Sequence, residues 1–409
     1  MRGHGEIAIK RRAFLTGGAG AGLASFFSPH FNEPPPRQTL HGKAGDIGGA
    51  TVPTTIVSLA DFGGLPDAPP AVLVNAFDQA YGVLKRRGGG TLIVPAGTYY
   101  FGAQTDAAYI ILCRNLRNVA ISAYGATFVA KTLARVVPNM FYFFNFQNIT
   151  IAGASFLDLG FSPWINWRGM YCVGVQADRK SGGLRMVDCY ADRVVGLLGA
   201  NNDAIGRHFL SDISVQGEVR NAYYGVGASF IEKMVYVKLV CHNVRRAFIA
   251  SSLSSAQIDL IVSNYANWPG SNGLVSLATA GSSSGDVNNV RAKVDVKGAC
   301  IHDAYIHFYH LGPEKHGVMR DIDATVNVVD PSSTGNLFVF DHEIRTVQPR
   351  TTRTWDRIFL HGTVAEGFKG NVVVNKSRST SPGTVYIDRN LVNAVRNDIL
   401  PAGFCVKSN

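Results

Sequence analysis

Three segments in the second half of the chain carry basic, acidic and phenolic side chains at positions that align. Residues 335–342 align with residues 370–377, each beginning with Gly-Asn, and residues 305–310 fit the same window. Each segment is typical of a β-strand, in which alternate side chains face opposite ways. The alternation directs Phe308 and Phe340 inward. It leaves one outward set: Tyr305, His307, Tyr309, Asp341 and Lys376.

This outward set has the chemistry needed for β-elimination from a uronic acid. The reaction needs a cation near the carboxylate to acidify the C5 proton, a base to remove that proton, and an acid for the leaving oxygen. Lys376 is the candidate cation, and His307 and Tyr309 are candidates for the base and the acid, beside Asp341. The alternative is an ordinary ladder of solvated residues, with Asp341 and Lys376 as a weak surface ion pair. The hypothesis depends on the register, because a slip of one residue turns the set inward.

Two further groups are candidates for substrate binding. Arg245 and Arg246 align near Asn221 one repeat earlier, and such a basic cluster can hold acidic sugars through bidentate contacts; scattered surface arginines are the alternative. Trp164 and Trp167 lie in an aromatic loop, where they can stack on sugar rings or form a small satellite core.

The sequence predicts no metal site and identifies no cofactor. The histidines in the segment from His302 to His316 match no tight ligand motif, and the six cysteines show no CxxC spacing. Buried thiols are expected for these cysteines, with disulfides as the alternative. No acidic cluster supports a calcium site, so calcium stays an unsupported option.

The elements that must position these residues are short strands that recur along the chain. Between Val119 and Val374, β-branched strands alternate with Gly, Asn, Asp and Ser turns, with a period that drifts between roughly 22 and 35 residues. This pattern predicts an all-β fold, a single-stranded right-handed parallel β-helix. A two-sheet sandwich is the structural alternative, but its hairpin signals are represented by only one Asn-Gly pair, Asn272-Gly273.

The ends of this solenoid are expected to be capped. Leu73, Phe77, Ala80 and Leu84 form one apolar stripe of a helix that Gly88 ends, so the segment 70–87 is predicted to cover the first repeat. Residues 378–409 are expected to form a C-terminal cap. The β-helix with its caps is predicted to occupy residues 55–409.

The same entrance segment carries a resemblance to a known family. Asp61-Phe62-Gly63, the helix around Phe77 and the run from Gly88 to Tyr99 resemble the opening of the pectate-lyase-like superfamily of carbohydrate-active β-helix proteins. The resemblance implies a parallel β-helix and covers roughly 45 residues. The acidic run usually found before the helix is replaced here by residues 65–70. Elements resembling polygalacturonases are reduced to faint echoes at Asn201-Asn202-Asp203 and Arg207-His208.

The N-terminus and the charge indicate where the protein works. Lys10-Arg11-Arg12 precedes a Gly/Ala-rich stretch, so residues 1–27 resemble a twin-arginine export signal and residues 28–54 a Pro/Gly-rich linker. Cleavage after Ala24 would remove a net +3 of the formal +10 and leave about +7. A periplasmic or extracellular location and an anionic glycan partner are expected, whereas nothing indicates nucleic-acid binding. No apolar run is long enough to span a membrane.

Together these patterns predict an exported protein that acts on an acidic, uronate-containing polysaccharide, with a polysaccharide lyase as the leading hypothesis. A glycoside hydrolase or a C5-epimerase of the same fold is the alternative within enzymes. A glycan-binding or structural β-helix without catalysis is the alternative from another class. The oligomeric state is not predicted.

Overall fold

The structure of the chain is a computed structural model. It describes residues 55–106, 108–133, 137–162, 168–201, 209–263, 273–279, 285–298, 301–310, 318–342, 355–376, 383–393 and 404–407. The predicted signal segment 1–27 and the linker 28–54 lie outside these residues, as do Trp164 and Trp167.

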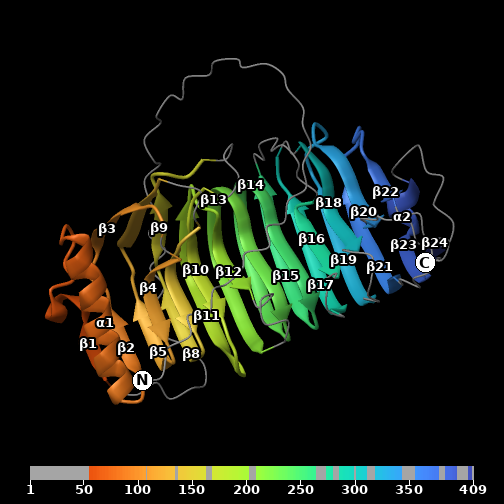
Figure 1. The fold of residues 1–409 in the computed structure, drawn as a ribbon. Helices are drawn as coiled ribbons and strands as arrows, with labels where there is room; N and C mark the ends of the chain where they lie inside the picture. Colours follow the sequence, from red (N-terminus) through yellow and green to blue (C-terminus); the bar gives the residue numbers. More distant parts are fainter. Residues whose placement is uncertain are drawn as a thin grey trace. The chain divides into compact units, whose positions relative to one another are not determined.

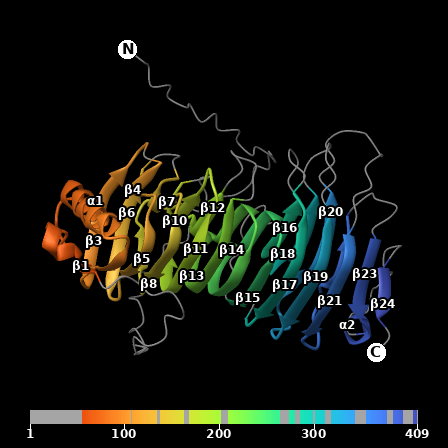
Figure 2. The ribbon, with the colours of Figure 1, turned by 90° about the horizontal axis from the view of Figure 1, so that it is seen from below.

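The strands stack in parallel and form three faces of one solenoid (Figures 1 and 2). The first face runs from one end to the other through β1 (Ile56–Ser58), β2 (Gly90–Ile93), β5 (Arg117–Ser122), β8 (Gln147–Ala152), β11 (Ser181–Asp192), β13 (Leu210–Ile231), β14 (Met234–Leu253), β15 (Ala256–Ser263), β17 (Val287–Val296), β19 (Met319–Val328), β21 (Trp355–Val364), β23 (Gly383–Asp388) and β24 (Phe404–Lys407). The second face begins with β3 (Gly97–Gln104), β6 (Ala126–Thr132) and β9 (Ser155–Asp158) and continues in the later parts of β11 and β13. The third face consists of β4 (Tyr109–Arg114), β7 (Asn139–Phe144), β10 (Tyr171–Gln176), β12 (Gly196–Asn201), the last parts of β13 and β14, and then β16 (Val275–Thr279), β18 (Ile301–His310), β20 (Thr334–His342) and β22 (Asn371–Asn375).

Residues with positive φ make the corners between faces. Asn221 and Asn243 have φ of 48° and 54°, a conformation that asparagine tolerates better than most residues. Their side chains also join neighbouring repeats, because Asn243 Nδ2 donates to Asn221 Oδ1 at 3.2 Å and Asn221 Nδ2 donates to Asp192 Oδ1 at 2.8 Å. These corners let the long strands β13 and β14 bend through all three faces without losing their pairing.

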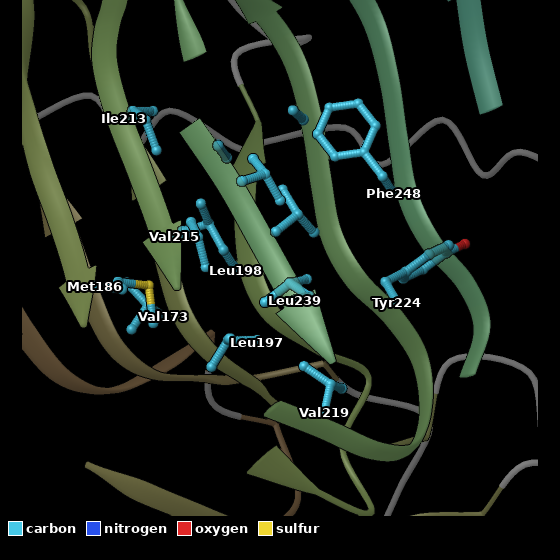
Figure 3. Packing of buried hydrophobic residues seen from close by; sticks show 14 of the residues in the cluster. Val173, Met186, Leu197, Leu198, Ile213, Val215, Val219, Tyr224, Leu239 and Phe248 are labelled. Carbon is cyan, nitrogen blue, oxygen red and sulfur yellow. The ribbon is translucent and has the colours of Figure 1, made fainter. Parts of the chain in front are cut away.

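The interior is a continuous apolar core. Inward side chains of successive strands stack upon one another, and the residues labelled in Figure 3 show this between β10 and β14, where Val173, Leu198 and Phe248 are fully buried. Removing such a column of apolar side chains from water is the main stabilising contribution to a solenoid. The prediction of an all-β right-handed parallel β-helix is confirmed.

Helix α1 (Pro70–Arg86) lies at the N-terminal end of the stack, after the short 3-10 helix η1 (Leu59–Phe62) (Figure 1). The four apolar residues that predicted it, Leu73, Phe77, Ala80 and Leu84, are fully buried. The Phe77 ring lies 5.5 Å from the ring of Phe141 and 6.2 Å from that of Phe128. The helix therefore covers the apolar end of the first repeats.

The C-terminal segment, which was predicted to be a cap, also extends the first face by two strands. Within the predicted cap 378–409, β23 pairs with β21 and β24 pairs with β23, so the first face continues to Lys407. Helix α2 (Arg389–Asn393) follows β23 and precedes β24 along the chain, and its Leu391 is buried.

Two other predictions concern cysteines and membranes. Four cysteines, Cys113, Cys172, Cys189 and Cys241, are buried free thiols, as the apolar strand positions predicted. Cys300 and Cys405 have no described side chains. Neither described helix has the length and hydropathy to cross a lipid bilayer.

Candidate functional site

The third face brings together the polar residues that the sequence alignment placed in one set. Tyr309 of β18 is the register partner of Asp341 in β20, and Phe340 is the partner of Asn375 in β22. Lys376 follows directly, and its backbone N–H donates to Phe340 O at 2.8 Å. Tyr309, Asp341 and Lys376 therefore occupy one column across three repeats, in the register that the sequence predicted. The roles of the four candidate catalytic residues remain predictions.

His307 lies beside this column and is almost completely buried, with 3% of its surface exposed. Its Nε2 is 3.6 Å from Asp341 Oδ2, and its ring centroid is 5.1 Å from that of Tyr309. Its Nδ1 is also buried and has no hydrogen-bond partner among the described residues. A neutral imidazole with its N–H toward Asp341 would leave an unshared electron pair on Nδ1, which is the form that can accept a proton.

Burial and the neighbouring charges together determine the protonation of His307. Burial is the largest influence and lowers the pKa of His307 below its ordinary value of 6.5. Asp341 opposes this shift, whereas the positive charges of Arg246 and Lys376 add to it. His307 is therefore neutral at neutral pH, as a general base must be.

This lowered pKa predicts an acid-sensitive fold. Protonation is disfavoured in the folded state, so the unfolded state binds more protons and stability falls as pH drops below about 6.5. We expect the fall in melting temperature between pH 7.5 and pH 5.5 to be smaller by about 1–3 °C in His307→Gln than in the wild type. Thermal unfolding followed by circular dichroism at both pH values measures the difference. His242, whose pKa is also lowered, keeps part of the slope in both proteins. Equal slopes would contradict the assignment.

Two small residues of the preceding repeat lie next to His307. Ser276 is the register partner of His307 on the preceding strand, and its Oγ is 3.5 Å from Gly273 O. A Cβ atom added at Gly273 would lie 2.6 Å from His307 Cβ, which is closer than van der Waals contact permits. Glycine at 273 therefore lets the main chain pass against the histidine.

The structure corrects the position of Tyr305. The alternation predicted that Tyr305 shares the outer face with His307, but Tyr305 is fully buried and its hydroxyl donates to Thr334 O at 3.2 Å. Its register neighbours on adjacent strands, Leu337 and Val372, are buried too. The residues from Ala304 to Phe308 are thus all buried, His307 among them, and the outward set becomes accessible only at Tyr309, Asp341 and Lys376.

The structure also corrects the alignment of the two arginines. Arg246 pairs with Tyr224, not with Asn221, because Asn221 and Asn243 occupy the corner and the arginines follow it. The guanidinium of Arg245 lies over the ring of Tyr223, 5.5 Å from its centroid. Arg246 is near enough to His307 to lower the pKa of the imidazole. One of the two predicted binding arginines therefore belongs to the surroundings of the candidate catalytic column.

Sequence reasoning missed the tyrosines of the third face. Tyr171 and Tyr224 stack with ring centroids 6.4 Å apart, and the Tyr171 ring lies against the place that a side chain at Gly199 would fill. A signal was present, because Gly174, Gly199 and Gly227 each stand between two apolar residues and are register partners. Glycine on the outer side of a strand indicates that another group approaches closely.

The described part of the chain contains no cluster of potential metal ligands. Among those residues, no three His, Cys, Asp or Glu side chains gather as a metal-binding group. Around His307 the charged groups are the carboxylate of Asp341 and the cations Arg246 and Lys376. This arrangement suits an anionic ligand that also presents a proton for removal.

Comparison with known proteins finds similar solved structures but no similar sequence family. No protein-family profile matches the chain, and no curated protein sequence matches it significantly. Among solved structures it is similar to an exopolygalacturonase from Thermotoga maritima, with 13% identity, a TM-score of 0.41, and coverage of 82% of this chain and 88% of that one. It is also similar to a double variant of the tailspike protein of the E. coli bacteriophage HK620 in complex with a pentasaccharide, with 14% identity, a TM-score of 0.26, and coverage of 82% and 67%. At these values the likeness concerns the fold and says nothing about substrate or mechanism.

Proposed function

We propose that the chain is a polysaccharide-acting β-helix enzyme that cleaves a uronate-containing polymer by β-elimination at the third face. The observation that supports this most strongly is the column of Tyr309, Asp341 and Lys376, with a buried, neutral His307 whose Nε2 is 3.6 Å from Asp341. Two cations beside one proton-accepting group meet the main requirement of the reaction, which is to acidify a proton next to a carboxylate.

In the proposed mechanism each residue has a separate task. Lys376 and Arg246 neutralise the uronate carboxylate, which stabilises the negative charge that develops when the C5 proton leaves. His307 accepts that proton at Nδ1, while Asp341 holds the opposite edge of the ring and stabilises the imidazolium that forms. Tyr309, which lies half-buried against His307, donates its phenolic proton to the leaving oxygen. Because Nδ1 is buried, the groups that cover it must move when substrate binds for Nδ1 to reach the sugar.

The reaction type is tested with a panel of polymers. Wild-type protein is incubated with polygalacturonate, alginate and a neutral glucan, and absorbance at the ultraviolet band of unsaturated uronates is followed. We expect absorbance to rise with at least one uronate polymer and not with the glucan, because neutral sugars lack the carboxylate that makes the C5 proton acidic. New reducing ends without absorbance would indicate a glycoside hydrolase, and binding without any product would indicate a non-catalytic glycan-binding protein.

Export to the periplasm or beyond is part of the same proposal, because an enzyme for large acidic glycans must meet them outside the cytoplasm. Arg11-Arg12 is the feature in the sequence that supports it. Replacing both arginines with lysine should leave precursor in the cytoplasm, since the twin-arginine pathway reads the arginine pair. Cell fractionation with an antibody against the protein measures this, and undiminished export of the variant would refute it.

A further inference from the structure

A second group of aromatic and basic residues, exposed or half-buried, lies on the third face, on its first two strands. Tyr109 of β4 is 42% exposed, and its ring is parallel to that of Tyr142 in β7, with an interplanar angle of 6° and a centroid distance of 5.7 Å. Beside this pair, the guanidinium of exposed Arg114 lies over the ring of Phe144, 5.3 Å from its centroid. The Tyr142 hydroxyl donates to Gln176 Oε1 on the next strand.

The same column of register partners joins these residues to the candidate catalytic column. From β4 to β10 the partners are Arg114, Phe144 and Gln176, and from β12 to β20 they are Asn201, Ser229, Ser251, Ala278, Tyr309 and Asp341. The two parts join where Val175, next to Gln176, pairs with Ala200, next to Asn201. Between its two ends, Gln176, Ser229 and Ser251 are half-buried and offer amide or hydroxyl groups, with Ser229 Oγ and Ser251 Oγ 2.8 Å apart. Eight strand-to-strand steps at about 4.8 Å each put the two ends roughly 38 Å apart.

We propose that Tyr109, Tyr142, Phe144 and Arg114 form a distal binding site for the acidic polysaccharide, so that one polymer chain lies along the column from this site to Tyr309. The inference rests on the proposed function for the identity of the polymer. Aromatic rings at the surface, Tyr109 above all, can cover the apolar face of a sugar, and the guanidinium beside them can pair with its carboxylate. The neutral hydrogen-bonding groups between the two ends suit sugar hydroxyls, and cations lie near both ends, with Arg114 at the first and Arg246 and Lys376 around His307 at the second.

The proposal is tested by affinity electrophoresis in gels that contain polygalacturonate or alginate. The variants are Tyr109→Ala and Arg114→Ala, and the matched control is Tyr386→Ala. Tyr386 also belongs to a stacked outward pair, with Phe359 at 5.0 Å and 9°, but on the first face. We expect the wild type and the control to be retarded equally by at least one polymer, and each distal variant to bind about 5- to 10-fold more weakly. Thermal unfolding checks that all variants are folded.

The outcomes separate this proposal from the proposed function. Unsaturated products formed at wild-type rate with unchanged retardation of Tyr109→Ala would overturn the distal site and leave the lyase reaction standing. Weaker retardation of the distal variants with no product from any protein would support the distal site and count against the lyase. Absence of retardation for the wild type, or an equal loss in Tyr386→Ala, would also overturn the distal site.

Discussion

Replacing Tyr309 with Phe, or Lys376 with Ala, should lower the rate at which uronate polymers give unsaturated products by about 100-fold or more. The phenylalanine keeps the ring against His307 and removes only the hydroxyl that donates the proton. The alanine removes the charge that stabilises the carbanion, and Lys376 is exposed, so the fold has little to lose. The measurement is the initial rate of ultraviolet absorbance at saturating polymer, with thermal unfolding as the check on structure.

The matched control is another exposed lysine, Lys238. It lies in the part of β14 that belongs to the first face, where it is the register partner of Asp259 in β15. Lys238→Ala changes the net charge by the same amount as Lys376→Ala but should leave the rate of product formation within about twofold. A general loss of positive charge affects mainly the rate at which the protein meets the polymer, which does not limit the reaction at saturating polymer. Full activity in both Tyr309→Phe and Lys376→Ala would show that the column is not the site of chemistry.

The largest expected effect on stability comes from Phe77→Asp. Phe77 is fully buried among the rings of Phe101, Phe128 and Phe141, so the change removes an aromatic side chain worth about 3–5 kcal/mol and buries a carboxylate in its place. We expect aggregation on expression or a fall in melting temperature of at least about 10 °C. Displacement of the helix by Phe77→Asp would also expose the edge of the first repeats to other protein chains.

Val72→Asp in the same helix is the control for Phe77→Asp. Val72 is 39% exposed and lies in the first turn of α1, where a negative charge is tolerated or favourable. It should therefore melt within about 2 °C of the wild type. If Phe77→Asp were as soluble and stable as Val72→Asp, the helix would not cap the core.

The sequence was sufficient for the fold and for the register of the candidate column. Gly335-Asn336 and Gly370-Asn371 begin equivalent strands, and the side chain of Asn371 donates to Asn336 Oδ1 at 2.8 Å, so the repeated asparagine marks the same corner of the solenoid in both repeats. An alignment anchored on this repeated pair gave the right neighbours for Asp341 and Lys376 because the register between the two strands does not shift between Asn336 and Phe340.

The alignment of Arg245 and Arg246 failed for the converse reason. It placed the arginines near Asn221, whereas Asn221 belongs to the corner with Asn243 and Arg246 pairs with Tyr224. The burial of Tyr305 could not be predicted either, because a two-residue alternation assumes that one side of the strand faces solvent, and β18 carries five consecutive buried residues from Ala304 to Phe308. The pairing of Tyr109 with Tyr142 depends on ring positions, since their strands place Tyr109 opposite Asn139.

The central claim, that the third face removes a C5 proton and eliminates the glycosidic oxygen, is tested most directly by nuclear magnetic resonance of the products. The wild type and Tyr309→Phe are incubated in heavy water with the uronate polymer that the protein binds best. The account predicts the olefinic proton of a 4,5-unsaturated uronate at each new chain end with the wild type, and its near absence with Tyr309→Phe. Saturated new ends, or deuterium at C5 without chain cleavage, would contradict it, the first as hydrolysis and the second as epimerisation.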